Sequence, residues 1–538
     1  MYLSFLSRLF GKQPDKIKFG ESSYSPPVLS PKNLEHLHKI NIDVTRNVLQ
    51  KCKADSSLDN MVQVNTNFCL YITLLGLSES QILQLTRDYN VLWPWTIQYD
   101  TARTSNSQKR FIYYPLAIVY VRNVSEVREW INLAVKQKLH VGVRSGGNSY
   151  ESFSIQNQII IDLSDLLPPF NTSDDGMTLS SGLRLGTIYT DLDKRNILLN
   201  GGICPQVAIG GLSLSGGNGY FIRKYGYVGD QIKGVEAVLS NGQIIIANER
   251  SHEDFFEACK GAGSAGIGVI TQITLKTFCF VRGTYFQTIW SINNASDILE
   301  AWQSLVDADD NLSGTVVTLV AGAPLFQING VYLGSSNQLK SLLKHNWFNL
   351  IPSIKPIVYT ADEMSLSQIH EELGSEVPQP TFSFWKLKSF YAFKKITSNE
   401  FQPLIEFLAK SELTNIDHPL IIGTIQIVLM GGKINSLKGG VFPAREGSVT
   451  WIHYGSLWIE QSYGPRGLKF VKEMNKIVQP LHSDVAMYNV PDLDLGSQST
   501  KDYRYLKAYW PNHVDFLLAV KKKYDPIDLF HFEQSLPV

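Results

Sequence analysis

The chain has 538 residues, too many for one ordinary hydrophobic core, so two or three domains are expected. Lysine plus arginine and aspartate plus glutamate both count 49, and this zero formal charge argues against a nucleic-acid binder that relies on bulk positive charge. Apolar residues make up 44% of the chain and charged residues only 18%, which excludes a largely disordered protein.

Residues 1–94 predict an N-terminal extension that is mostly helical. Helical periodicity covers residues 34–58 and 76–90, and Ser78 stands where an N-cap would begin the second of these helices. This part of the chain carries no recognisable chemistry, so its function stays open.

Residues 95–280 change in character and predict a domain of strands and helices. A helix is expected at 125–138, where apolar residues recur at helical spacing after Ser125. Strands are expected at 111–121, 139–145, 158–166, 235–248 and 269–278. This β-α-β order with polar, glycine-containing turns indicates an α+β or α/β domain.

Residues 281–489 alternate longer strands with helices. The strand-like segments include 314–322, 421–432 and 448–458, and several strands of this kind indicate a large, mostly antiparallel sheet in a second domain. The last segment, 516–530, predicts a helix that ends before Pro526.

No targeting segment, membrane segment or metal site is expected. Arg8 and Lys12 interrupt the apolar start of the chain, and no apolar run reaches the roughly 18 residues of a spanning helix, so a cytoplasmic location is favoured. The five cysteines form no CxxC pair, and an odd, sparse set is not a disulfide scaffold. They are Cys52, Cys69, Cys204, Cys259 and Cys279.

Two glycine-rich stretches carry most of the chemical information. The first, VRSGGNSYESFS (143–154), follows a strand, and its bare backbone N–H groups and serine hydroxyls could wrap a pyrophosphate, although a plain turn would also explain it. The second, residues 201–232, holds seven glycines between 201 and 219. Packed elements rarely tolerate that density, whereas close approach of the backbone to a flat ligand would explain it.

A third stretch, GAGSAG (261–266), matches G-x-G-x-x-G but does not indicate a dinucleotide-binding turn. That motif needs a strand before it and a helix after it. Here a helix-like segment precedes the glycines and a strand-like segment follows them, so the order is reversed.

Seven motifs in the same order resemble the FAD-linked oxidases of the berberine-bridge-enzyme-like group, which carry a flavin domain of the p-cresol methylhydroxylase and vanillyl-alcohol oxidase type. The resemblance runs from about residue 95 to the C-terminus. The motifs read RSGGNSYESFS, CPQVAIGG, RKYGYVGDQ, DFFEACKGAGSAGIGVIT, the Gly431-Gly432 pair with VFPAR, AMYNVPDLDLG and YDPIDLFHFEQSLP.

The resemblance implies an α+β fold in which FAD lies extended between two domains. The FAD-binding domain would span 95–280 and have two subdomains, the substrate domain would span 281–489 with a large antiparallel sheet covered by helices, and 490–538 would return to the FAD domain. The residues expected to contact FAD are Arg144, Ser145, Gly146, Gly147, Asn148, Ser149, Tyr150, Ser154, Cys204, Val207, Gly210, Gly211, Ser215, Gly216, Gly217, Asn218, Asp230, Gly266, Gly268, Val269 and Ile270.

The flavin attachment departs from the family pattern. The family uses a histidine of the first motif, but Asn148 occupies that place and cannot form the histidyl bond. The second attachment point is present as Cys204, so the chain is expected to carry a single cysteinyl–FAD bond or no covalent bond. A buried, inert thiol is the alternative for Cys204.

The catalytic positions depart as well. A family tyrosine that accepts the substrate's hydroxyl proton is replaced by Val490, and an earlier tyrosine by Met487. Tyr488 lies two residues before Val490 and would face the same side of a strand, so it could replace the missing tyrosine as the base. The alternative is that Tyr488 is a packed aromatic residue. Gln426 stands where members carry Glu or Gln and can orient a hydroxyl but not accept its proton.

Tyr150 is the third catalytic candidate. Its phenol has an ordinary pKa near 10, so it needs a cationic or hydrogen-bonding neighbour to act as a base at neutral pH. Lys386 and Lys388 are candidate neighbours, and solvated charges are the alternative.

The expected activity is therefore transfer of hydride to FAD from an alcohol, a sugar or a secondary metabolite. Val207 stands three residues after Cys204, where a small residue accompanies dioxygen access in the family, so dioxygen is the expected acceptor. A dehydrogenase with another acceptor and a flavin-binding scaffold without turnover are the alternatives. Neither a nucleic acid nor a membrane is an expected partner, and the oligomeric state stays open.

Overall fold

The computed structural model describes residues 75–538 apart from 95, 97, 105–107, 168–169, 174–175, 376–382 and 415–419. The helix expected at 34–58, together with Cys52 and Cys69, lies outside the described residues. The helix expected at 76–90 is present as α5 (Glu79–Asp88). Its N-cap is Ser78, whose hydroxyl accepts a hydrogen bond from the backbone N–H of Gln81.

A four-stranded sheet follows, in the order β1 (Asn90–Leu92), β2 (Ala117–Tyr120), β4 (Ile159–Asp162) and β3 (Val141–Arg144). β2, β4 and β3 are parallel, and β1 is an antiparallel edge. The expected helix at 125–138 is α7 (Val124–Gln137), and it connects β2 to β3. Its apolar stripe, which includes Trp130, Ile131 and Ala134, is buried in the core of this sheet.

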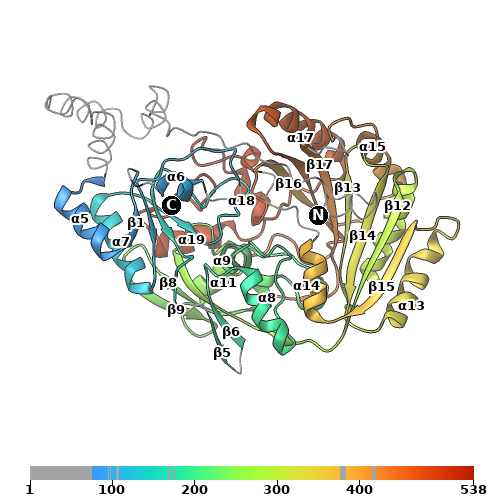
Figure 1. Ribbon diagram of the computed structural model, residues 1–538, viewed down its shortest axis with the longest axis horizontal. Coiled ribbons are helices and arrows are strands. Elements are labelled where there is room, and N and C mark those ends of the chain that lie inside the picture. The colour runs from blue at the N-terminus through green and yellow to red at the C-terminus, as the bar shows by residue number, and fades with distance from the viewer. Residues whose placement is uncertain are drawn as a thin grey trace.

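A second, antiparallel sheet has five strands in the order β5 (Phe170–Ser173), β6 (Gly176–Ser180), β10 (Val269–Leu275), β8 (Ile232–Val238) and β9 (Ile244–Asn248). Helices that share its hydrophobic core include α8 (Leu185–Leu192), α11 (Glu253–Ala262) and α19 (Val514–Tyr524). The four- and five-stranded sheets with the helices packed on them are called the first lobe, at the left of Figure 1.

The second lobe is a seven-stranded antiparallel sheet with its helices. The strand order is β15 (Val358–Met364), β12 (Gly283–Ser291), β14 (Leu325–Tyr332), β13 (Leu312–Val320), β17 (Ile421–Leu429), β18 (Thr450–Trp458) and β16 (Phe384–Ala392). The expectation of a large antiparallel sheet in an α+β fold is thus confirmed.

Helices cover one face of this sheet and leave the other to face the first lobe. α12 (Ala295–Trp302), α13 (Ser336–Asn346), α15 (Ser398–Ala409) and α17 (Gly464–Val478) bury their apolar sides against the outer face (Figure 1). α14 (Leu366–Ser375) lies on the inner side, and its Leu366, Ile369 and Leu373 join a mixed aromatic cluster between the lobes.

Strand alternation decides which side chains face the first lobe. In β17, Ile425 and Ile427 pack under the outer helices, so Gln426 and Val428 point to the inner face. In β18, Ile452 packs outward in the same way. Polar residues can therefore occupy the inner face although the strands as a whole are buried.

The C-terminal part returns to the first lobe. α18 (Arg504–Tyr509) and α19 pack there, and the backbone N–H of Val141 in β3 donates to the carbonyl of Leu529 at 2.9 Å. α19 ends at Tyr524, before Pro526, as expected. Among the helices of the described residues, none is both long and apolar enough to cross a membrane.

Candidate functional site

The two glycine-rich stretches lie against each other. A Cβ on Gly146 would lie 2.7 Å from the backbone nitrogen of Ala208, and a Cβ on Gly210 would lie 2.9 Å from the hydroxyl oxygen of Ser145. Asn148 donates from Nδ2 to the carbonyl of Gln206 at 3.2 Å. Glycine is required at 146 and 210 because any side chain would push the two stretches apart.

The second stretch is also tied to the segment at 486–496. Gly216 and Gly217 adopt φ values of 118° and 80°, which favour glycine. The N–H of Gly217 donates to Oδ1 of Asn489 at 2.7 Å, and Nδ2 of Asn489 donates to the carbonyl of Leu212 at 3.1 Å. At Gly211, by contrast, no atom lies within 4 Å of the Cβ position, so the chain is open there.

Several buried polar atoms around these stretches make no hydrogen bond within the described residues. They are Nδ2 and Oδ1 of Asn218, Oγ of Ser154, Oγ of Ser181 and Oδ1 of Asn200. Leaving one such group unsatisfied costs about 1–3 kcal/mol. A concentration of them beside an open glycine fits a bound molecule rich in hydrogen-bonding atoms, such as FAD.

Two of the predicted FAD contacts instead form ion pairs inside the protein. Arg144 pairs with Asp162, donates to the carbonyl of Ala102 at 2.7 Å, and is only 3% exposed. The carboxylate of Asp230 accepts hydrogen bonds from both terminal nitrogens of Arg445, at 2.9 and 2.6 Å. Each of these charges already has a partner inside the protein, and contact of either side chain with FAD stays a prediction.

The remaining predicted FAD contacts are residues that hydrogen-bond within the protein or lie in buried backbone near the glycine-rich stretches. Ser149 accepts the N–H of Phe153 at 3.0 Å, and Ser215 is bonded to Ser264. Gly266 has φ of 87° and its carbonyl accepts from Nζ of Lys521 at 2.8 Å. Those that lie beside these residues, or in the buried start of β10, are Gly147, Val207, Gly268, Val269 and Ile270. Their contact with FAD stays a prediction.

Tyr150 lies between Cys204 and the inner face of the sheet. Its ring meets Trp385 of β16 edge-on, with centroids 6.0 Å apart, and its hydroxyl makes no hydrogen bond to any residue that the structure describes. Burial, with a smaller contribution from Cys204, raises the pKa of Tyr150 to about 12. The phenol is therefore protonated at neutral pH and suited to donating a hydrogen bond rather than to accepting a proton.

Lys386 and Lys388 are neither neighbours that activate Tyr150 nor solvated charges. Nζ of Lys386 lies 2.6 Å from Oε1 of Glu151 and also bonds Asp492, and Nζ of Lys388 lies 2.6 Å from both Asp492 and Asp494. This ion cluster joins three segments of the chain: the first glycine-rich stretch, β16 and the segment at 486–496.

Tyr488 does not face the catalytic side, because residues 486–496 form no strand. The N–H of Val490 donates to the carbonyl of Met487 in a turn, which brings these two side chains into the inter-lobe cluster. Tyr488 points the other way and packs between Tyr509 and Trp510 in the core of the first lobe. The structure thus favours the packed-aromatic alternative and contradicts the expected strand.

Replacing Tyr488 with phenylalanine is expected to leave substrate oxidation unchanged. The hydroxyl donates to the carbonyl of Gln534 at 3.2 Å inside the core, so its loss should cost about 1 kcal/mol of stability. Parallel measurement of the urea unfolding midpoint and of the rate of flavin reduction tests this. A Y488F rate reduced tenfold or more would restore Tyr488 as a candidate base.

Gln426 points to the inner face and is paired with His453, a residue that the sequence patterns did not single out. The two residues are direct cross-strand partners, and Nε2 of His453 lies 2.6 Å from Oε1 of Gln426. Nε2 of Gln426 donates to Oγ1 of Thr318 at 3.3 Å. The alternation of β18, combined with its pairing to β17, was the signal that could have found His453.

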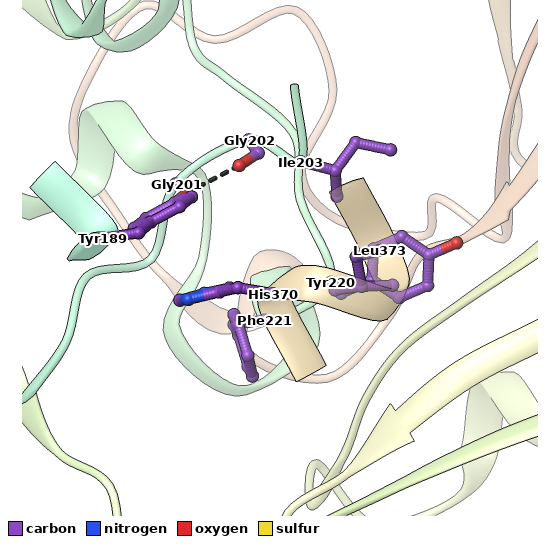
Figure 2. A pocket seen from close by; sticks show the side chains of 8 residues that line it. All are labelled: Tyr189, Gly201, Gly202, Ile203, Tyr220, Phe221, His370 and Leu373. Carbon is purple, nitrogen blue, oxygen red and sulfur yellow. Dashed lines mark hydrogen bonds between the residues drawn. The ribbon is translucent and has the colours of Figure 1, made fainter. Parts of the chain in front are cut away.

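A small cavity lies around the backbone of residues 201–203, which precede Cys204 in the chain (Figure 2). The hydroxyl of Tyr189 donates to the carbonyl of Gly202 at 2.6 Å, and the His370 ring stacks on Tyr189 with centroids 4.0 Å apart. The cavity volume is about 10 Å³, the room of roughly one water molecule. It cannot hold a flavin, but its walls fix the backbone that presents Cys204.

Comparisons with known proteins agree with this geometry. A family model described as an FAD binding domain matches residues 115–248, and one described as berberine and berberine like matches residues 486–537. The chain thus contains an FAD binding domain and a berberine-like C-terminal domain, and several of its relatives are named berberine bridge enzyme-like. The two matched regions contain the first glycine-rich stretch and the turn at Met487–Val490.

The relatives match over most of the length of this chain. An FAD-linked oxidoreductase, dpmaF, of Metarhizium anisopliae is 26% identical over 81% of this chain and 87% of its own. A chitooligosaccharide oxidase of Gibberella zeae is 26% identical over 79% of this chain and 88% of its own. The solved structure of BBE-like 1 from Physcomitrella patens, 23% identical, superposes with a TM-score of 0.75 over 86% of this chain and 99% of its own. The protein is therefore an FAD-linked oxidoreductase.

Proposed function

We propose that the protein is an FAD-dependent oxidase that removes hydride from a carbon bearing a hydroxyl group. The group of unpartnered buried atoms at Asn218, Ser154 and Ser181, which lie in or beside the two glycine-rich stretches, is the observation that carries the proposal. When bound, FAD would supply the hydride acceptor. The chain's own residues would bind the cofactor and orient the substrate against it.

The division of labour follows the two lobes. Residues 95–280 with 490–538 would hold FAD, mainly through backbone of the two glycine-rich stretches and the side chains of Asn218, Ser154 and Ser181. Residues 281–489 would form the substrate-binding domain.

The flavin would be attached through Cys204 alone. The thiol of Cys204 is free and half-buried, and Asn148 holds the neighbouring stretch with its amide bonded to two carbonyls. A thioether to a cysteine needs no second attachment point, so the absence of a histidine at 148 is compatible with a covalent flavin.

The substrate would be a sugar or another alcohol. The inner face presents the indole N–H groups of Trp385 and Trp451, both buried and without a hydrogen-bond partner among the described residues. Such groups suit a substrate that offers hydroxyl oxygens as acceptors and an apolar ring face for stacking. A relative is named a chitooligosaccharide oxidase, which supports the same class.

Replacing Cys204 with serine is expected to abolish covalent flavin while leaving the protein yellow. Acid precipitation of the wild-type protein should leave the flavin absorbance in the pellet, whereas precipitation of C204S should release it to the supernatant. Cys259, a buried thiol whose pKa burial raises above its ordinary value, offers the control, because C259S should keep the flavin in the pellet. A wild-type protein that releases all its flavin would refute the linkage.

The same preparation tests the oxidase assignment. Anaerobic addition of D-glucose, N,N′-diacetylchitobiose or a benzylic alcohol should bleach the flavin, and air should restore it with formation of hydrogen peroxide. Val207, whose N–H donates to the carbonyl of Cys204 at 3.1 Å, is the small residue on which dioxygen access would depend. Slow recovery in air with fast recovery on an artificial acceptor would instead identify a dehydrogenase.

A further inference from the structure

The inner face of the second lobe carries a row of polar side chains that crosses five strands. Gln327, Thr318, Gln426, His453 and Ser389 are successive cross-strand partners on β14, β13, β17, β18 and β16. Direct partners point to the same face of a sheet, so the whole row looks toward the first lobe. Burying such a row costs free energy unless its polar groups are hydrogen-bonded, either to one another or to a bound molecule.

His453 is the titratable group of this row. Its Nδ1 atom is buried and makes no hydrogen bond to any of the described residues, and its ring lies 4.9 Å from that of Trp451. Trp451 and Trp385, on the same face, are 6% and 7% exposed and have indole N–H groups that also lack partners. Two donors and one imidazole nitrogen on one face are the polar lining that a hydroxylated ligand would need.

The hydrogen bonds around His453 determine its tautomer. Nε2 of Gln426 donates to Thr318, so Oε1 is the atom that faces His453 at 2.6 Å. A carbonyl oxygen only accepts, so Nε2 of His453 must carry the hydrogen. In the neutral ring the lone pair then lies on Nδ1, the atom that has no partner.

The other candidate bases are not available. Tyr488 is in the core of the first lobe, Tyr150 is protonated because its pKa is about 12, and glutamine is not a base. Val490 and Met487 occupy the positions of the family's tyrosines. Met487 is nevertheless close to the row, because its N–H donates to Oγ of Ser389 at 3.2 Å.

We propose that His453 is the group that takes the proton of the substrate's hydroxyl, through Nδ1, and that Gln426 holds the required tautomer. This role rests on the proposed function. In the step, the substrate's O–H and C–H bonds break and a C=O bond forms. The proton goes to Nδ1 of His453, and the hydride with its two electrons goes to the FAD that acts as oxidant.

The charge state of His453 is compatible with this role. Burial lowers the pKa of the imidazole to about 4, so the ring is neutral and its lone pair free at physiological pH. The strands beside it present Gln426 and Ser389, which do not titrate, and on the same face Tyr391, which is neutral because burial raises its pKa. Trp451, its neighbour within β18, carries no charge, and across the lobe interface Met487 is also neutral. The proton-accepting form should therefore be lost only below about pH 4.

The first test replaces His453 with glutamine and follows anaerobic flavin reduction by the fastest of three probes: D-glucose, N,N′-diacetylchitobiose and a benzylic alcohol. Loss of a general base is expected to slow reduction by about 10²–10⁴-fold. The flavin spectrum and its linkage should be unchanged, and added imidazole should restore part of the H453Q rate. His482 is a matched control, since it stacks on Phe390 of the outer-face core and H482Q should reduce normally.

A second variant tests the partner. Gln426→Glu places a carboxylate beside Nε2, which should stabilise the imidazolium and move the acid limb of the reduction rate upward by about 1–3 pH units from its position near 4. A merely structural role for His453 predicts no such shift. A wild-type rate and pH profile in H453Q would overturn the proposal.

A readout that needs no turnover separates this proposal from the proposed function. In holoprotein labelled with ¹⁵N-histidine, the signal lost in H453Q should report a neutral ring with hydrogen on Nε2 at pH 7. Hydrogen on Nδ1, or a charged ring at that pH, would overturn the role of His453 even where no probe is oxidised. A protein that takes up no FAD would defeat the proposed function itself, and this proposal with it.

Discussion

Replacing Lys386 with methionine should lower the free energy of unfolding by up to about 3–5 kcal/mol, because two buried carboxylates each lose a counter-ion: among the described residues, Glu151 keeps only Arg110, and Asp492 keeps only Lys388. The Lys386 side chain is 5% exposed, and its partners Glu151 and Asp492 are 1% and 7% exposed. Burial by itself would lower the pKa of Lys386, but Asp492, Glu151 and Asp494 outweigh burial and raise that pKa. The lysine is therefore charged at neutral pH, and the pairs are real ion pairs.

The unfolding midpoint in urea measures this effect, with two further variants as controls. Lys395→Met removes a surface pair with Asp307, whose members are 46% and 75% exposed, and should cost less than about 1 kcal/mol. Lys386→Met combined with Glu151→Gln removes one of the two carboxylates that lose a counter-ion and should recover part of the loss. Equal midpoints for K386M and K395M would show that the buried cluster contributes no more than a surface pair.

The cluster also has a functional consequence. Glu151 directly follows Tyr150, and Asp492 follows the turn at Met487–Val490, so Lys386 joins the three segments that border the proposed site. Gln108 reinforces the same junction by donating to the carbonyls of Tyr150 and Trp385, at 2.9 and 2.7 Å. We expect K386M to reduce flavin retention as well as stability, because the ion pairs that join β16 to Glu151 and Asp492 would be lost.

Replacing Arg223 with methionine should destabilise the protein by at least about 4 kcal/mol. Arg223 is fully buried in α10 (Ile222–Tyr225) and donates only to backbone carbonyls of the second lobe. These belong to Leu312 and Ala308, both at 2.9 Å, to Val306 at 3.2 Å and to Met430. Hydrogen bonds from a charged donor are worth about 1.5–3 kcal/mol each, and the carbonyls would be left unpaired.

The adjacent residue provides a matched comparison for Arg223. Lys224 carries the same charge one residue later but pairs with Asp310 at 2.8 Å where both side chains are 30% exposed, so K224M should cost about 1 kcal/mol or less. Arg223→Lys should lie between the two, since a lysine reaches fewer of the four carbonyls. A midpoint for R223M within error of K224M would contradict the assigned role. Burial lowers the pKa of Arg223 to about 10, so the group remains charged throughout such measurements at neutral pH.

The sequence by itself determined the local elements and the cofactor chemistry. Periodicity placed α7 and α19 and the buried strands β17 and β18 because apolar spacing is a property of neighbouring residues. The glycines at 146, 210, 216 and 217 identified the two stretches that lie together, since their backbone geometry requires glycine wherever the rest of the chain is. Ordered motifs sufficed to identify the family.

Only the tertiary structure decided which side chains face the site. The direction of the Tyr488 side chain depends on the turn in which the N–H of Val490 donates to the carbonyl of Met487. The ion-pair partners of Arg144, Asp230 and Lys386 come from other segments of the chain. His453 became a candidate only when the pairing of β18 with β17 placed it opposite Gln426. Burial, tautomer and charge pairing are set by the atoms that surround a residue in space, and a linear pattern does not contain those distances.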